Sequence, residues 1–223
     1  MQPRILLDEA RTPDGSTLQL TSRSGYFEVS LGGMPLMSSS QHHSEESMAE
    51  LACEGAAAGP DARVMVGGLG MGYTLRAALD RLRPDATVVV VELMEAVVRW
   101  NRGPLAELAE RPLDDPRTHL EVVDLVDYLA GKPQPFDAIL LDVDNGPEPF
   151  TTKGNARLYN QRGLSRLRAA LRPAGTLVVW SAFDSAGFVG EMQRAGFSAH
   201  SERARSRGKK GGRHTLYVGR RPA

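Results

Sequence analysis

Residues 63–92 read RVMVGGLGMGYTLRAALDRLRPDATVVVVE, and this stretch decides the fold class. An apolar run at residues 63–66 enters a glycine loop, an amphipathic segment follows, and a second apolar run closes on Glu92. Apolar strands that alternate with amphipathic helices are typical of a parallel sheet covered on both faces. The stretch therefore predicts a strand, a helix and a second strand parallel to the first.

The same alternation continues to the end of the chain. We expect strands at residues 63–66, 87–92, 119–123, 138–142 and 176–181, and helices at 73–82, 95–101, 125–130, 161–171 and 184–195. Two further strands, at 197–204 and 214–220, flank a basic turn with the sequence SRGKKGGR. The pattern predicts an α/β fold with a Rossmann-like, seven-stranded, mostly parallel sheet and helices on both faces.

The N-terminal segment has a different pattern. Residues 4–37 form short apolar runs separated by glycine turns, which is typical of a small antiparallel unit. Such a unit is too small to be stable alone, so we expect it to pack at one edge of the main sheet. We therefore divide the chain into an N-terminal β unit, residues 1–40, and a Rossmann-like catalytic domain, residues 41–223, which begins with a helix.

Composition limits the possible partners and locations. The 223 residues carry 27 Lys plus Arg and 27 Asp plus Glu, so the chain has no global basic charge for nucleic acid, and we expect a small-molecule partner. The single cysteine, Cys53, excludes an internal disulfide framework and a zinc site built on several thiolates. No run approaches the roughly 18–20 apolar residues of a membrane span, and we expect a cytoplasmic location.

The glycine loop predicts a nucleoside site. Gly67, Gly68, Gly70 and Gly72 lie between a strand and a helix, where backbone N–H groups and a helix N-terminus can approach a ligand. Glu92 follows Gly72 by 20 residues at a strand end, where a carboxylate can accept both ribose hydroxyls. The third glycine of the dinucleotide pattern G-x-G-x-x-G is missing, so the loop suits adenosine with a sulfonium side chain.

Acidic residues follow two later strands. Asp124 is placed either to accept from the adenine amino group or to cap the next helix, and both roles are compatible. Asp142 opens a long loop that also holds Asp144, Glu148 and Tyr159, and chemistry in an open α/β sheet lies beyond such strand ends. Asp142 and Asp144, two residues apart at this strand end, are the candidate catalytic residues. Their carboxylates can take the proton from an amine, whose pKa of about 10.4 opposes release at neutral pH by about 4 kcal/mol.

These motifs resemble the spermidine/spermine synthase family, the polyamine aminopropyltransferases, which have the class I S-adenosylmethionine-dependent methyltransferase fold. The resemblance rests on the N-terminal β unit, the glycine loop, VVVVELMEAVV at residues 88–98 and Asp142. It implies a homodimer and decarboxylated S-adenosylmethionine as co-substrate, without a metal. It also implies that Asp142 is the general base, Glu92 the ribose ligand and Asp124 an adenine contact, with a gate over the amine from Asp144 onward.

Three departures concern the substrate. The family's GGGDGG is GGLGMG here, which puts Gly70 where the family has the aspartate that holds the aminopropyl ammonium. The gate motif is shortened to DVDNGP at residues 142–147, and the family's Tyr-His-Glu is replaced by Ser44, Glu45 and Glu46. We expect Glu45, Glu46, Glu148 and Tyr159 to contact the substrate. The loss of the acid at Gly70 makes S-adenosylmethionine-dependent methylation of a small molecule the alternative, and a lapsed enzyme the third interpretation.

Two further sequence features are compatible with other functions. The basic run between Arg203 and Arg213 raises nucleic-acid methylation as a hypothesis, but the base-methylase motif Asn/Asp-Pro-Pro-aromatic is absent and a solvated turn is the simpler interpretation. His42 and His43 stand near Glu45 and Glu46, yet adjacent histidines on one helix point in different directions, so no metal site is expected. Trp100 and Trp180 are expected in the core.

Overall fold

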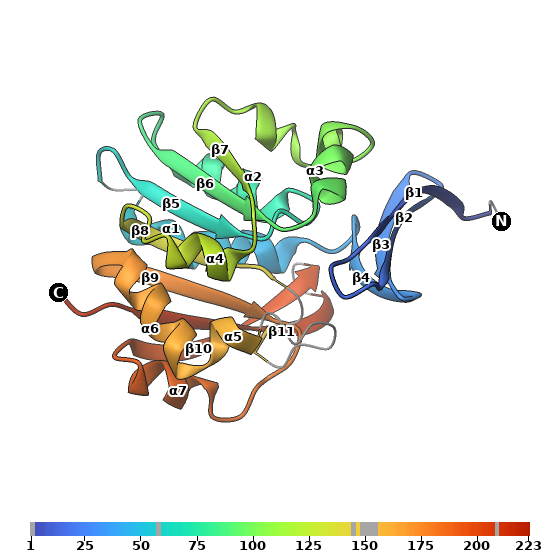
Figure 1. Ribbon diagram of the computed structural model, residues 1–223. Coiled ribbons are helices and arrows are strands. Elements are labelled where there is room, and N and C mark those ends of the chain that lie inside the picture. Colours follow the sequence, from blue (N-terminus) through green and yellow to red (C-terminus); the bar gives the residue numbers. More distant parts are fainter. Residues whose placement is uncertain (1–2, 57–58, 144–145, 148–155, 208–209) are drawn as a thin grey trace.

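The computed structural model describes residues 3–56, 59–143, 146–147, 156–207 and 210–223, and it contains two sheets (Figure 1). The smaller sheet is antiparallel, with strands in the order β1-β2-β3-β4. Its strands are β1 (Ile5–Arg11), β2 (Thr17–Arg23), β3 (Tyr26–Leu31) and β4 (Met34–Ser38). These are the short N-terminal strands that the glycine turns predicted.

The larger sheet has seven strands in the order β10-β11-β9-β8-β5-β6-β7. They are β5 (Arg63–Gly67), β6 (Thr87–Glu92), β7 (Thr118–Val122), β8 (Phe136–Leu141), β9 (Leu171–Ser181), β10 (Ser198–Arg207) and β11 (Lys210–Arg220). Strands β5 to β9 are mutually parallel, whereas β11 runs antiparallel to both β9 and β10. The predicted α/β fold with a seven-stranded, mostly parallel sheet is confirmed.

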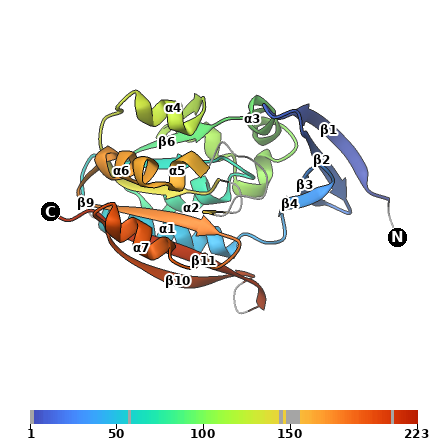
Figure 2. The same ribbon diagram turned by 60° about the horizontal axis from the view of Figure 1, so that its bottom comes forward.

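Helices cover both faces of this sheet (Figure 2). One face carries α1 (His43–Ala56), α2 (Tyr73–Arg81) and α3 (Glu95–Arg102); the other carries α4 (Leu125–Ala130), α5 (Ala156–Tyr159), α6 (Gln161–Ala170) and α7 (Phe188–Arg194). Two short 3-10 turns, Ala106–Ala109 and Pro112–Asp114, precede β7. Because side chains alternate along a strand, Val64 and Val66 pack toward α1 and α2 while Met65 packs toward α4.

The position of the small sheet differs from the prediction. We expected it at a lateral edge, but it lies beyond the carboxyl ends of the parallel strands (Figure 1). Asp8 of β1 accepts hydrogen bonds from Trp100 Nε1 at 2.7 Å and from Arg99 at 3.3 Å, which fastens the sheet to α3. This arrangement puts β4 over the glycine loop instead of beside an edge strand. The division at residues 40 and 41 stays a prediction.

The basic segment near the C-terminal end is mostly strand. We predicted a turn over residues 206–213, whereas β10 continues to Arg207 and β11 begins at Lys210, so the prediction was wrong at both ends. A register shift between Arg205 and Arg207 accommodates the hairpin, and Arg207 donates to the backbone and hydroxyl oxygens of Ser40. Backbone pairing therefore outweighed the turn signal of the glycines.

The single cysteine and the lengths of the helices were both considered from the sequence, and the structure describes both. Cys53 is a free cysteine in the core, and burial raises the pKa of its thiol to about 12. In the part of the chain that the structure describes, no helix combines the length and apolarity that crossing a membrane requires.

Candidate active site

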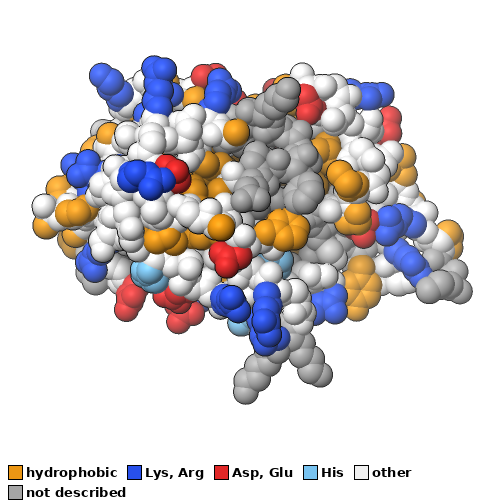
Figure 3. Space-filling view, turned by 90° about the horizontal axis from the view of Figure 1, so that it is seen from below, with side chains coloured by type: hydrophobic (Ala, Val, Ile, Leu, Met, Phe, Trp, Pro, Cys, Tyr) orange, Lys and Arg blue, Asp and Glu red, His pale blue; other side chains and the backbone are white. Residues whose placement is uncertain are grey.

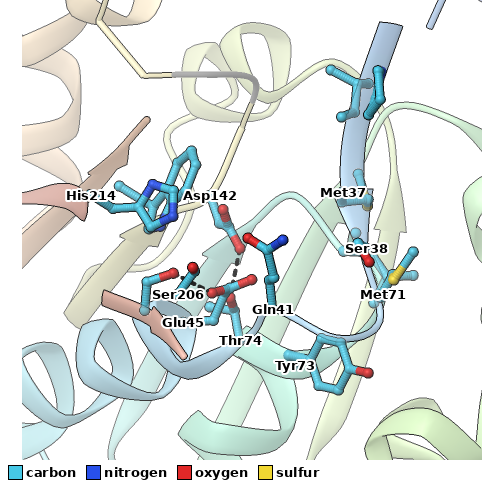
Figure 4. A pocket seen from close by; sticks show the side chains of 16 residues that line it. Met37, Ser38, Gln41, Glu45, Met71, Tyr73, Thr74, Asp142, Ser206 and His214 are labelled. Carbon is cyan, nitrogen blue, oxygen red and sulfur yellow. Dashed lines mark hydrogen bonds between the residues drawn. The ribbon is translucent and has the colours of Figure 1, made fainter. Parts of the chain in front are cut away.

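A cavity of about 350 Å³ lies between the two sheets, at the carboxyl ends of β5 and β8 (Figure 4). Its walls come from β4, the start of α1, the glycine loop, the first turn of α2 and the three strands β9 to β11. The lining residues are Pro35, Leu36, Met37, Ser38, Gln41, Ser44, Glu45, Leu69, Gly70, Met71, Tyr73, Thr74, Asp142, Trp180, Ser206 and His214. The switch-point rule therefore located this cavity correctly.

Gly68 and Gly72 of the loop are each required to be glycine for a different structural reason. Gly68 has φ +91°, and a Cβ there would stand 2.3 Å from the carbonyl oxygen of Asp142, so a side chain is excluded. Gly72 has φ +85° and precedes α2, where a Cβ would approach Asn101 Oδ1 to 3.1 Å. Asn101 also donates a 2.8 Å hydrogen bond to the Gly70 carbonyl. Asn101, which the sequence did not single out, therefore holds the loop from α3.

Glu92 is tied to the same loop. Its side chain is buried, and its carboxylate accepts the backbone N–H of Leu69 at 2.9 Å and that of Met94 at 2.7 Å. Two N–H donors stabilise an ionised carboxylate and fix its orientation beside the glycines. The predicted adjacency of Glu92 and the loop is thus present, while its role as a ribose ligand stays a prediction.

Asp124 caps α4, one of the two roles considered from the sequence. Its Oδ1 accepts the backbone N–H of Val126 at 2.7 Å, and its Oδ2 lies 3.4 Å from Arg157. Arg157 belongs to α5, so this ion pair joins two helices on the same face of the sheet. The adenine contact stays a prediction.

Two carboxyl groups meet in the cavity, on Glu45 from α1 and Asp142 from the end of β8 (Figure 4). Burial, followed by the negative charge of Asp142, raises the pKa of Glu45 to about 7. A 2.5 Å hydrogen bond from the Ser44 hydroxyl acts in the opposite direction and lowers this pKa. Burial also raises the pKa of Asp142, while a hydrogen bond from Thr74 lowers it. Like charges in one desolvated site favour retention of a proton until a cation enters.

The remaining predicted site residues are distributed differently. Asp144 and Glu148 lie outside the described residues. Glu46 does not line the cavity, because its carboxylate pairs with His42 at 2.9 Å and His43 at 3.0 Å. Tyr159 is buried away from the cavity and donates to the carbonyl oxygen of Val143 at 3.4 Å, which ties α5 to the chain that follows β8. Of the four residues expected to contact the substrate, Glu45 lines the cavity, Glu46 and Tyr159 do not, and Glu148 is not described.

Several lining residues were not anticipated. Trp180 packs against the core, as expected, and it also lines the cavity together with Ser206 and His214 from the C-terminal hairpin. Thr74 and Gln41 also face the carboxyl pair (Figure 4). The sequence carried no local signal for these residues because strand pairing between distant segments brings them together.

His42, just before α1, and His43, its first residue, have solvent-accessible side chains. Both Nδ1 atoms approach the Glu46 carboxylate, and the His42 ring stacks on Tyr73 with centroids 4.3 Å apart. Across the described ranges, no group of three or more His, Cys, Asp or Glu side chains is arranged to hold a metal ion.

The described basic side chains of the hairpin do not form a separate basic face. Arg207 is bound to Ser40, and Arg203 lines a surface pocket with Glu50, Glu54 and Glu202. Lys and Arg side chains on this side of the molecule are interspersed with Asp and Glu (Figure 3). Phosphate binding favours clustered cations without nearby carboxylates, so this arrangement gives no support to nucleic-acid binding.

The fold and the site together define a class, an α/β fold of the methyltransferase type with a glycine loop, a strand-end acid and an acidic cavity. No protein-family model matches the chain. Two solved structures share its fold across 96% of its length and 72% of theirs. One is a spermidine synthase in complex with the transition state analogue AdoDATO, with TM-score 0.75 and 15% identity; the other is spermidine synthase from Thermotoga maritima, with TM-score 0.73 and 16% identity.

Curated relatives point to one family within this class. The polyamine aminopropyltransferase 1 of Hyperthermus butylicus is 33% identical over 119 residues, covering 52% of this chain and 39% of that protein. The polyamine aminopropyltransferase 1 of Streptomyces coelicolor is 34% identical over 128 residues, covering 56% of this chain and 23% of that protein. The match thus spans well under half the length of these relatives, and the resemblance to polyamine aminopropyltransferases is confirmed.

Proposed function

We propose that the protein is a spermidine synthase-like transferase that moves an aminopropyl group from an S-adenosyl donor to an amine. The observation that carries this proposal is the carboxyl pair of Glu45 and Asp142 in a cavity bordered by the glycine loop. A desolvated acidic pair attracts one ammonium group and can accept its proton, which is the requirement of an amine nucleophile.

The reaction is a displacement at carbon. The amine nitrogen attacks the methylene carbon next to the sulfonium, the new C–N bond forms as the C–S bond breaks, and the electron pair returns to sulfur. The products are a neutral thioether nucleoside and an alkylated amine, and the carboxylate of Asp142 takes one proton from the attacking nitrogen. Alignment and proton removal supply the rate acceleration, so no step requires a metal.

We propose that the nucleoside binds to the glycine loop and Glu92. In this proposal the loop amides face the donor, Glu92 accepts the ribose hydroxyls and Asp124 accepts the adenine amino group. Asp144 and Glu148 belong to the proposed gate over the amine. The adjacency of Leu69 N–H and the Glu92 carboxylate supports a single binding surface formed by both.

One observation favours methyl transfer as a second candidate. Gly70 stands where the resembling family has an acid, and a Cβ there would meet only the Met37 sulfur at 3.6 Å. Space for a side chain is present, but Gly70 has φ +52°, which strains any other residue, and the loop offers no counter-charge to an aminopropyl ammonium. Without that acid, the carboxylate of intact S-adenosylmethionine meets less repulsion.

Calorimetry with decarboxylated and intact S-adenosylmethionine, followed by mass analysis of the alkylated amine, tests the proposal. We expect tighter binding of the decarboxylated donor and an aminopropyl mass increment. Asp142→Asn should retain donor binding and lose turnover by at least about a hundredfold. Preference for the intact donor with a methyl increment would replace the aminopropyl proposal with the second candidate.

We further propose a homodimer in a cytoplasmic setting. Strand β1 is an edge of the small sheet, and its Ile5, Leu6 and Leu7 are 58%, 51% and 43% exposed. An exposed apolar edge strand is suited to pairing with a second copy. Sedimentation of the protein and of Leu6→Lys should give a dimer and a monomer, respectively; a monomeric parent would dismiss this assembly.

A further inference from the structure

Three buried polar atoms in the cavity wall lack a partner. Trp180 Nε1, Ser206 Oγ and His214 Nδ1 make no hydrogen bond to any described residue. Ser206 is only 2% exposed, and all three side chains line the cavity that holds Glu45 and Asp142. Buried polar atoms that remain unpaired cost free energy, so a ligand that satisfies them gains affinity.

Strand pairing puts these groups together. In the β9–β11 pairing, Leu216 stands opposite Trp180, and His214 lies two positions earlier on the same face of the sheet. The centroids of the Trp180 and His214 rings are 4.7 Å apart. Ser206 lies two residues beyond Ala204, the partner of His214, and a Cβ on Gly212 would lie within 3.7 Å of both the Ser206 hydroxyl and His214 Nε2. The three groups therefore form one polar cluster.

The cluster lies on one side of the carboxyl pair and the glycine loop on the other. Figure 4 shows Glu45 and Asp142 between Met71 on the loop side and His214 with Ser206 on the hairpin side. An amine whose nitrogen is held by the carboxyl pair would therefore have its other end within reach of the cluster.

The hydrogen-bonding chemistry of the cluster determines which chemical group the far end of the amine can carry. An indole N–H only donates, a hydroxyl does either, and burial lowers the pKa of His214, which favours the neutral imidazole. The described acids of the cavity are Glu45 and Asp142, and neither belongs to the cluster. Within the described lining of the cavity, a second ammonium would face the Trp180 donor and no carboxylate beside it. A ligand carboxylate would meet no described cation there, since Arg207 is bound to Ser40.

We propose that the acceptor is a primary amine whose far end carries an uncharged, hydrogen-bond-accepting oxygen, as in an amino alcohol, rather than a diamine. This inference rests on the proposed function, since the carboxyl pair must hold the reacting nitrogen. The oxygen accepts from Trp180 Nε1, and a hydroxyl on the ligand can also donate to Ser206 Oγ or His214 Nδ1.

Matched acceptors of equal length test the inference. We would compare 4-amino-1-butanol with 1,4-diaminobutane, and 5-amino-1-pentanol with 1,5-diaminopentane, in calorimetric binding to the protein saturated with the thioether nucleoside and in kcat/KM with the decarboxylated donor. We expect the amino alcohols to be preferred by on the order of tenfold in both measurements. Equal or better binding of the diamines would overturn the inference.

Variants locate the preference. Trp180→Phe and His214→Phe should reduce the preference for the amino alcohol to about one, because they weaken binding of the amino alcohol more than binding of the diamine. His200→Phe is the matched control, because His200 lies on the same hairpin, pairs with Glu202 and does not line the cavity. If the preference for the amino alcohol persists in both cluster variants, it arises elsewhere in the protein and the inference is contradicted.

The two proposals fail differently. If diamines bind and react better than amino alcohols, the aminopropyl transferase stands and the acceptor inference falls. If amino alcohols bind better but receive no aminopropyl group, the ligand class is upheld and the proposed reaction falls.

Discussion

The hydroxyl of Thr74 donates a 2.6 Å hydrogen bond to Oδ2 of Asp142, which stands 68 positions later in the chain. This bond joins the first turn of α2 to the end of β8, directly beneath the glycine loop. It favours the ionised form of a carboxyl group whose pKa burial otherwise raises. The hydroxyl therefore orients the proposed base and opposes its retention of a proton.

Replacing Thr74 by Val should move the acidic limb of the pH–rate profile to higher pH. Valine has the shape of threonine without the hydroxyl, so the pKa of Asp142 loses the bond that lowers it. We expect turnover at neutral pH to fall by on the order of tenfold, as the loss of one hydrogen bond to a charged group would give, and to recover partly at higher pH. Thr74→Ser, which keeps the hydroxyl, is the control. An unaltered profile in the Val variant would separate Thr74 from the chemistry.

Replacing Glu92 by Gln should weaken donor binding and destabilise the fold. The carboxylate accepts two backbone N–H groups, whereas an amide presents its own N–H₂ to one of them. We expect a loss of about 1–3 kcal/mol in the free energy of unfolding and weaker calorimetric binding of the donor. Glu95→Gln, at an exposed position at the start of α3, is the matched control. Normal donor affinity in Glu92→Gln would exclude Glu92 from the nucleoside site.

Replacing Glu45 by Gln should make the unliganded protein more stable at alkaline pH. The pKa of Glu45 is raised from 4.5 to about 7 in the fold, so its favourable contribution is complete below about pH 4.5 and is lost as the pH rises through 7. At roughly 1.4 kcal/mol per pKa unit, the variant should gain up to about 3 kcal/mol at pH 8 relative to pH 4. Denaturant unfolding at both pH values measures this difference.

The control for that experiment is Glu50→Gln, an exposed position on the same helix. It should show little pH-dependent gain, because its carboxylate is exposed to water and lies outside the acidic pair. An equal pH-dependent change in the free energy of unfolding of the two variants would mean that ionisation of Glu45 beside Asp142 does not destabilise the fold.

Replacing Gly68 by Ala should be far more damaging than replacing Gly187. Both glycines have φ +91°, so both alanines suffer the same backbone strain of about 1–2 kcal/mol. At Gly68 the methyl group also meets the Asp142 carbonyl at 2.3 Å, while at Gly187 nothing lies within 4 Å. We expect an additional loss of about 1–3 kcal/mol and weakened donor binding in Gly68→Ala alone. Similar unfolding free energies for the two would contradict the close approach.

Local patterns predicted the central part of the fold well. Strand β6 and helix α4 have the predicted bounds, because a continuous apolar run and an Asp cap are signals contained within a few residues. The adjacency of the glycine loop, Glu92 and Asp142 was also predictable, since parallel strands bring their carboxyl ends to one edge. The individual ligand roles of these residues stay predictions.

The hairpin side of the cavity was not predictable. Trp180, Ser206 and His214 come together through the register of β9, β10 and β11, which no single segment encodes. The position of the small sheet was missed for a similar reason, because its attachment through Asp8 and Trp100 joins residues 92 positions apart. Helix α7 begins at Phe188 instead of residue 184, since Gly187 in the left-handed region starts it later.

The bond between Arg207 and Ser40 joins segments 167 residues apart, so the cavity is enclosed only when the last strands have docked on the first helix. During synthesis the glycine loop and Glu92 leave the ribosome long before Ser206 and His214 do. A nascent chain that stops after β9 would have the loop and the acidic pair but no closed wall around them. Ligand affinity can therefore report on completion of folding, and cleavage within the hairpin should abolish binding while the parallel strands remain paired.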